Sequence, residues 1–120
     1  METVAVIGAS PNQDRYANKA IRLLAGHGHT PVPVAPTHET IEGRKVYPSL
    51  AEVPEKIDTV TLYVAPARQS DIIEQIIQAA PRRVIFNPNT ENPGAYAQLK
   101  AAGIEVTEAC TLVLLKTNQY

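Results

Sequence analysis

The strongest constraint on the fold is the alternation of short apolar runs with stretches of helical periodicity. Residues 3–7 (TVAVI) and 59–65 (TVTLYVA) are apolar on both faces, which is typical of strands buried in a parallel sheet. Residues 15–25 and 69–80 place apolar side chains at the spacing of one helical face. Strands that alternate with helices in this way predict a parallel sheet with right-handed crossovers.

The remaining segments complete a predicted sheet of about five strands. We expect three further strands, at residues 30–35, 83–86 and 104–107, and a third long helix at 92–102. We also expect a short strand at 45–47 and a short helix at 49–52. Pro31 and Pro33 cannot donate ladder hydrogen bonds, so the second strand should pair irregularly or lie near an edge. The apolar tail at 111–115 should pack on the domain. Residues 1–120 are therefore predicted to form a single α/β domain, a Rossmann-like doubly wound parallel sheet with helices on both faces.

Composition argues against several classes of protein. The net charge is −1 with acidic and basic residues mixed along the chain, which is unlike the basic surface of a nucleic-acid binder. The first residues lack the pattern of a signal peptide, and no apolar run approaches the roughly 20 residues that span a bilayer. A lone cysteine, Cys110, excludes an internal disulfide and a cysteine-based metal cluster. We expect a cytoplasmic protein with no metal site.

The loop after the first strand is a candidate phosphate-binding loop. In a doubly wound sheet, ligands bind beyond the carboxyl ends of the strands. The loop begins with Gly8, Ala9 and Ser10 and continues to Asn12. Gly8 permits a tight turn, the small residues let backbone amides approach a ligand, and the next helix offers its N-terminus to an anion. The alternative is an ordinary small-residue turn between a strand and a helix.

The same loop departs from the fingerprint of dinucleotide-binding proteins. That pattern has three glycines, and Ser10 stands where the second glycine would be. It also has an acidic residue at the end of the second strand, whereas this strand ends at Val34, Ala35 and Pro36. Both departures argue against NAD, and neither argues against another adenine nucleotide.

Three predicted strands end in an apolar residue, a small or amide residue, and proline. These ends contribute the candidate binding residues Val34, Ala35, Pro36, Val64, Ala65, Pro66, Asn87 and Pro88. Proline stops strand pairing and turns the chain outward. Three such ends would form an apolar rim that suits an adenine ring or a pantetheine arm, although strand termination alone also explains each proline.

Several motifs together resemble a known family. They are VAVIGASP (4–11), RYA (15–17), VAP (34–36), IEGRKVYPSL (41–50), DTVTLYVAP (58–66) and AGIEV (102–106). They make the chain similar to the small stand-alone CoA-binding domain family and, more distantly, to the N-terminal domain of the succinyl-CoA synthetase α subunit. Segment 41–50 is the most distinctive, because a generic Rossmann domain has no reason to carry it.

The resemblance implies a site for coenzyme A or an acyl-CoA. Residues 8–10, 34–36 and 64–66 would build it, and Arg15 would meet a phosphate unless it is a solvated surface charge. The chain departs from the family pattern at Ala35, where relatives often carry Asn, and at Asn89 in the stretch after the fourth strand.

The sequence shows no convincing nucleophile, base or metal set, so we predict no catalytic residues. The expected function is a stand-alone CoA-binding protein without activity of its own and with a small-molecule cofactor as its partner. Two alternatives remain open: a small NAD(P)-binding oxidoreductase or redox sensor, and a regulatory subunit with a vestigial crevice. Homodimer formation is also open. Cys110 is predicted to be structural, because no neighbouring cation activates it. The alternative is a mixed disulfide with CoA.

Overall fold

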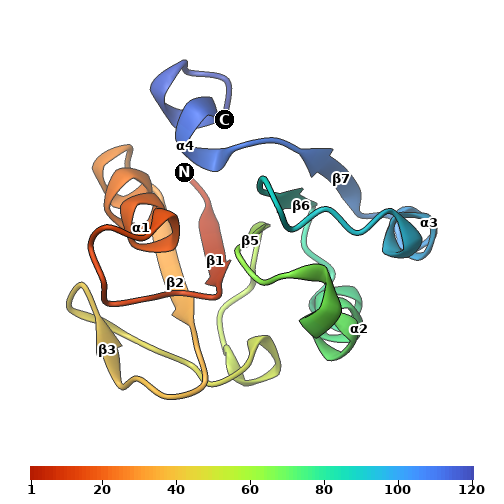
Figure 1. Ribbon diagram of the computed structural model, residues 1–120, viewed down its shortest axis with the longest axis horizontal. Coiled ribbons are helices and arrows are strands. Elements are labelled where there is room, and N and C mark those ends of the chain that lie inside the picture. Colours follow the sequence, from red (N-terminus) through yellow and green to blue (C-terminus); the bar gives the residue numbers. More distant parts are fainter.

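The computed structural model describes residues 1–120 and contains a five-stranded parallel sheet in the order β2-β1-β5-β6-β7 (Figure 1). The strands are β1 (Thr3–Ile7), β2 (Thr30–Val34), β5 (Thr59–Leu62), β6 (Arg83–Phe86) and β7 (Glu105–Glu108). The helices are α1 (Tyr16–Gly26), α2 (Ser70–Ala79), α3 (Pro93–Ala101) and α4 (Thr111–Lys116). The minor elements are the hairpin β3 (Thr40–Ile41) and β4 (Arg44–Lys45) and the 3-10 turns η1 (Leu50–Glu52) and η2 (Pro66–Arg68). The strand order reverses between β1 and β5.

The sheet buries both of its faces, as a doubly wound fold requires. In β1, Val4 and Val6 pack in one apolar cluster with α1 and α4, while Ala5 and Ile7 pack in the other. The second cluster contains side chains from α2 and α3. This alternation is the period-two pattern of a strand covered on both sides. The predicted Rossmann-like α/β fold is confirmed.

Strand β2 lies at an edge of the sheet, as its two prolines predicted. The Thr30 amide donates to Glu2 O at 2.8 Å, so alternate residues of β2 face β1 and the residues between them face outward. Pro31 and Pro33 therefore place their nitrogen atoms, which carry no hydrogen, at the outer edge. Beyond them, the Tyr47 amide donates to Pro33 O at 3.1 Å and forms a single bridge with the end of β2.

Several element boundaries differ from the prediction. The strand expected over 59–65 ends at Leu62, and α1 begins at Tyr16. The predicted short strand at 45–47 is divided between β4 and the bridge at Tyr47. The tail expected at 111–115 is the helix α4, which is only six residues long and so carries little periodicity. None of the helices has the length and apolar character needed to span a bilayer.

A polar network closes the end of the sheet opposite to the carboxyl ends of the strands. The carboxylate of Glu2 forms an ion pair with Arg82, accepts a hydrogen bond from Thr59 Oγ1 at 2.8 Å, and lies 3.6 Å from Arg83 Nη2. The Arg83 guanidinium lies over the ring of Tyr120, 4.5 Å from its centroid. Burial opposes ionisation of Glu2, but the hydrogen bond and the two arginines lower its pKa below the ordinary value.

Candidate functional site

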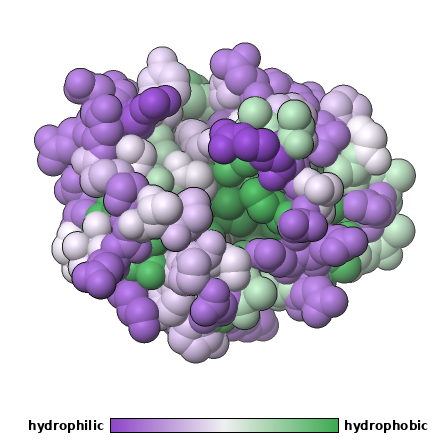
Figure 2. Space-filling view, turned by 60° about the horizontal axis from the view of Figure 1, so that its bottom comes forward, coloured by the Kyte–Doolittle hydropathy of each residue, from purple (hydrophilic) through white to green (hydrophobic).

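A pocket of about 630 Å³ opens at the carboxyl ends of β1, β2 and β5, where the strand order reverses. Its volume is within the range of small-molecule sites. Figure 2 shows a hydrophobic hollow on this face, surrounded by hydrophilic residues. The position agrees with the rule that open α/β sheets bind ligands at the point of strand reversal.

The pocket brings together eight of the residues proposed from the sequence and leaves out five. Those that line it are Gly8, Ala9, Ser10, Arg15, Val34, Ala35, Pro36 and Val64. Those that do not are Asn12, Ala65, Pro66, Asn87 and Pro88. Sequence reasoning missed the other lining residues, which are Ile7, Tyr16, Ala17, Pro48, Ser49, Leu50, Tyr63, Arg68, Ile72 and Gln75.

Gly8 forms the sharp turn between β1 and the loop. Its φ is +89°, a conformation that residues with a side chain rarely adopt. A Cβ added here would lie 2.7 Å from Tyr63 O and 3.1 Å from Val64 Cγ2. The loop is therefore pressed against the chain that follows β5, and only glycine fits this contact.

The loop presents fewer amides to a ligand than its small residues suggested. The amides of Gly8 and Ala9 both donate to Val34 O, at 3.1 and 3.2 Å, so they point toward the end of β2. These two amides are therefore already paired within the protein. The amides of Ser10 and Tyr16 have no acceptor within the protein. Free donors therefore remain at Ser10 and at the start of α1, where the helix N-terminus favours an anion.

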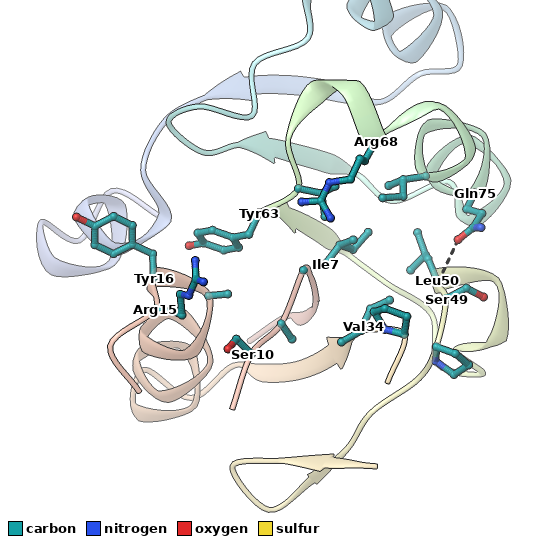
Figure 3. A pocket seen from close by; sticks show the side chains of 18 residues that line it. Ile7, Ser10, Arg15, Tyr16, Val34, Ser49, Leu50, Tyr63, Arg68 and Gln75 are labelled. Carbon is teal, nitrogen blue, oxygen red and sulfur yellow. Dashed lines mark hydrogen bonds between the residues drawn. The ribbon is translucent and has the colours of Figure 1, made fainter. Parts of the chain in front are cut away.

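Arg15 and Arg68 are the only charged side chains that line the pocket. Neither makes a side-chain hydrogen bond or an ion pair. Arg15 is the residue that precedes α1, and Arg68 ends η2 and reaches over the pocket from the side opposite to Ser10 (Figure 3). Two unpaired guanidinium groups and no carboxylate make the pocket suited to a ligand with several negative charges.

One end of the pocket is mainly apolar, because Val34 and Leu50 lie there (Figure 3) and Ile72 packs against the same apolar cluster as both of them. Gln75 of α2 fixes this end, because its Oε1 accepts a hydrogen bond from the Leu50 amide at 3.1 Å (Figure 3). The Gln75 Nε2 group makes no hydrogen bond within the protein and is free to donate. Residues 48–50 belong to the 41–50 motif, which was the available signal that this segment has a role at the site.

Side chains outside the pocket hold the loop after β1 in place. Asn18 Nδ2 donates to Ser10 O and to Glu42 Oε2, each at 3.0 Å. Glu42 stands at the turn of the β3–β4 hairpin and also accepts a hydrogen bond from Gln13 Nε2 at 3.3 Å. The hydrogen bonds from Asn18 and Gln13 lower the pKa of Glu42 below its ordinary value. The hairpin therefore supports the loop from its outer side.

Asn87 occupies a structural position instead of a place on the pocket wall. Its side chain is buried, and Nδ2 donates to Thr61 Oγ1 at 2.8 Å and to Leu62 O at 3.0 Å. Its Oδ1 accepts a hydrogen bond from the Thr111 amide at 2.9 Å. The side-chain amide of Asn87 therefore joins the end of β6 to β5 and to the start of α4. All of its hydrogen-bonding atoms have partners within the protein.

Two groups that could react are poorly suited to chemistry in the pocket. Tyr63 lines the pocket, but burial raises the pKa of its phenol to about 12, which disfavours the phenolate that could act as a base. Cys110 is partly buried, precedes α4, and does not line the pocket. No group of three His, Cys, Asp or Glu side chains lies close enough together to hold a metal ion.

Two solved structures and one CoA ligase are similar to this chain over most of its length. The solved structure of an uncharacterized protein is 38% identical, with a TM-score of 0.94 and coverage of 100% of this chain and 98% of that one. A hypothetical protein from Pyrococcus horikoshii OT3 is 35% identical, with a TM-score of 0.85 and coverage of 94% and 81%. The acetate–CoA ligase (ADP-forming) I of Archaeoglobus fulgidus is 30% identical over 104 residues, which are 87% of this chain.

The chain spans only 14% of the length of that ligase, so the similarity concerns one part of the larger enzyme. The family described as the CoA binding domain matches residues 2–116, which is nearly the whole chain. The matched range contains every residue that lines the pocket. The chain belongs to the CoA binding domain family.

Proposed function

We propose that this chain binds coenzyme A or an acyl-CoA in the pocket and has no catalytic activity of its own. The observation that carries the proposal is the composition of the pocket, which combines an apolar end with two unpaired arginines and no carboxylate. Coenzyme A has matching chemistry, because it carries a pyrophosphate, a 3′-phosphate, an adenine ring and an uncharged pantetheine arm. Membership of the CoA binding domain family supports the same ligand.

The pyrophosphate would lie at the N-terminus of α1. There the free amides of Ser10 and Tyr16 and the guanidinium of Arg15 can donate to phosphate oxygens. The adenine ring would lie at the apolar end, against Leu50 and Ile72. Burial of the ring there would supply apolar contact, and the charged groups would remain near the mouth.

The lining residues also favour coenzyme A over NAD. NAD sites usually hold the ribose hydroxyls with a carboxylate, and no Asp or Glu lines this pocket. The same absence, together with the lack of a lining His or Cys, leaves Ser10 and Ser49 without a base to activate them. These features support a role in binding, in which any reaction of the bound thioester would need a separate protein or domain.

Isothermal titration of the chain with CoA, acetyl-CoA, NAD and NADP tests the proposal. We expect heat with both CoA species and none with NAD or NADP. Binding of NAD or NADP without binding of either CoA species would refute the proposal.

A charge-inserting variant tests where the ligand lies. Ser10→Glu should weaken CoA binding by about 2 kcal/mol or more, because the new carboxylate would repel the pyrophosphate. Gln78→Glu is the matched control, since it adds one negative charge at an exposed position of α2 outside the pocket. If folded Ser10→Glu binds CoA as tightly as this control, the ligand does not occupy the loop.

A further inference from the structure

We propose that Arg68 makes the site selective for adenine nucleotides that carry a 3′-phosphate, as coenzyme A does. The inference rests on the proposed function, since it concerns the same pocket. It goes further by assigning the ligand's two anionic groups to different cations. Arg15 is assigned to the pyrophosphate, and Arg68 to the phosphate on the ribose.

The first observation is that Arg68 has no partner in the protein. Three other arginines of the chain are engaged, Arg22 with Asn18 and both Arg82 and Arg83 with Glu2, whereas Arg68, like Arg15 and Arg44, is not. Arg68 lines the pocket with no carboxylate beside it, and all of its side-chain donors are free. A guanidinium presents these donors in a planar fork that matches two oxygens of a phosphate.

The second observation is the division of the pocket. At the α1 end, a pyrophosphate would already be bound by the Ser10 amide, the helix N-terminus and Arg15. With the adenine at the apolar end, the ribose lies between the two regions. Arg68 is the only other cationic side chain that lines the pocket, and it reaches over the middle of the site (Figure 3). A phosphate on the ribose would therefore face Arg68.

The third observation is that the backbone carrying Arg68 is held firmly. The Arg68 amide donates to Ala65 O at 3.0 Å, which closes the η2 turn. The next residue, Gln69, is completely buried, and its Nε2 donates to Val64 O and to Thr90 O, each at 2.8 Å. These bonds fix the turn relative to β5 and to the loop after β6. The guanidinium therefore extends from a fixed point, as a selective contact requires.

The test compares CoA with 3′-dephospho-CoA, which differs only by the absent phosphate. Both are titrated into the unaltered chain and into the variants Arg68→Met, Arg15→Met and Arg44→Met. Methionine keeps an unbranched apolar side chain and removes the charge. Arg44 is the matched control, because it also lacks an ion-pair partner but lies on β4 outside the pocket.

We expect the unaltered chain to bind CoA about tenfold or more tightly than dephospho-CoA, the size of effect typical for a hydrogen-bonded charge. Arg68→Met should lose this discrimination by binding CoA more weakly while its affinity for dephospho-CoA stays the same. Arg15→Met should lower the affinity for both ligands by a similar factor, and Arg44→Met should leave both affinities unchanged. Thermal denaturation should show that Arg68→Met is folded, since the exposed Arg68 side chain makes no hydrogen bond or ion pair within the protein.

The contrary outcomes separate the two proposals. Two results would show that Arg68 does not recognise the 3′-phosphate, while the proposed function stands. The unaltered chain would bind both ligands with equal affinity, or Arg68→Met would lower its affinity for both by the same factor. If the unaltered chain binds neither ligand, the proposed function and the assignment of Arg68 are both wrong.

Discussion

Replacing Asn87 by alanine should destabilise the fold and leave the ligand affinity of the folded protein unchanged. The Asn87 side chain makes three hydrogen bonds, to Thr61 Oγ1, Leu62 O and the Thr111 amide, and none of its atoms lines the pocket. The prediction therefore separates a structural role from the binding role that its position after β6 suggested.

The magnitude follows from what each partner loses. The Thr111 amide has no other acceptor and lies in a residue with no exposed surface, so leaving it unpaired costs about 1–3 kcal/mol. Thr61 Oγ1 keeps a partner in Thr111 Oγ1 at 2.8 Å, so the two bonds donated by Nδ2 are worth about 0.5–1.5 kcal/mol each. The expected loss is about 2–6 kcal/mol, a large part of the roughly 5–15 kcal/mol that stabilises a domain.

Thermal and urea denaturation measure this loss, which should lower Tm by roughly 10 °C or more. CoA titration well below the new Tm measures the affinity of the folded fraction. Gln98→Ala is the matched control, because it removes an amide side chain from an exposed position of α3 and should change Tm little. An Asn87→Ala protein that keeps its Tm but binds CoA more weakly would refute the structural role.

Three further changes have defined outcomes. Gly8→Ala should cost about 2–5 kcal/mol in urea denaturation, because alanine is strained at φ +89° and its Cβ would lie 2.7 Å from Tyr63 O; a loss below about 1 kcal/mol would contradict this packing. The folded-state pKa of Glu2 is depressed, so its ion pair with Arg82 should stabilise the fold fully above the ordinary pKa of 4.5 and progressively less as pH falls through the folded pKa. In Tm measurements against pH, Glu2→Gln should flatten this dependence, and an unchanged profile would exclude Glu2 as its source. Cys110→Ser should keep CoA affinity and change stability by less than about 1 kcal/mol, because the thiol lies outside the pocket. A rapid stoichiometric adduct with CoA disulfide, detected by intact-protein mass spectrometry and absent in Cys110→Ser, would instead identify thiol exchange.

The layered fold was predictable because the buried strands are apolar on both faces and the helices are amphipathic. The edge position of β2 also followed from its prolines, since a residue without an amide hydrogen is tolerated at an open edge. Helix α4 was not predictable from periodicity, because a helix of six residues spans fewer than two turns. Its position depends on packing against α1 and on the hydrogen bond from the Thr111 amide to Asn87.

The candidate site was only partly predictable, because the direction of a side chain depends on tertiary structure. Gly8 and Ser10 were found from the loop pattern, since a tight turn after a strand is a local property. Arg68 and Gln75 were missed, because a basic residue in a turn and an amide on a helix resemble ordinary surface residues. Asn87 shows the converse, since the motif that suggested a binding rim also suits a buried side chain that joins neighbouring strands.

The prolines of β2 also bear on how copies of this chain can associate. Free amides at a sheet edge allow another molecule to add a strand, which is a common route to aggregation. The outward positions of β2 carry no amide hydrogen at Pro31 and Pro33, and Tyr47 occupies the end of that edge. The other edge, β7, has an acidic residue at each end, Glu105 and Glu108. Antiparallel pairing of two β7 strands would bring these like charges together. Sheets that continue through the β2 edges or through the β7 edges of two copies are thus disfavoured, at β2 by the missing amide hydrogens and at β7 by like charges.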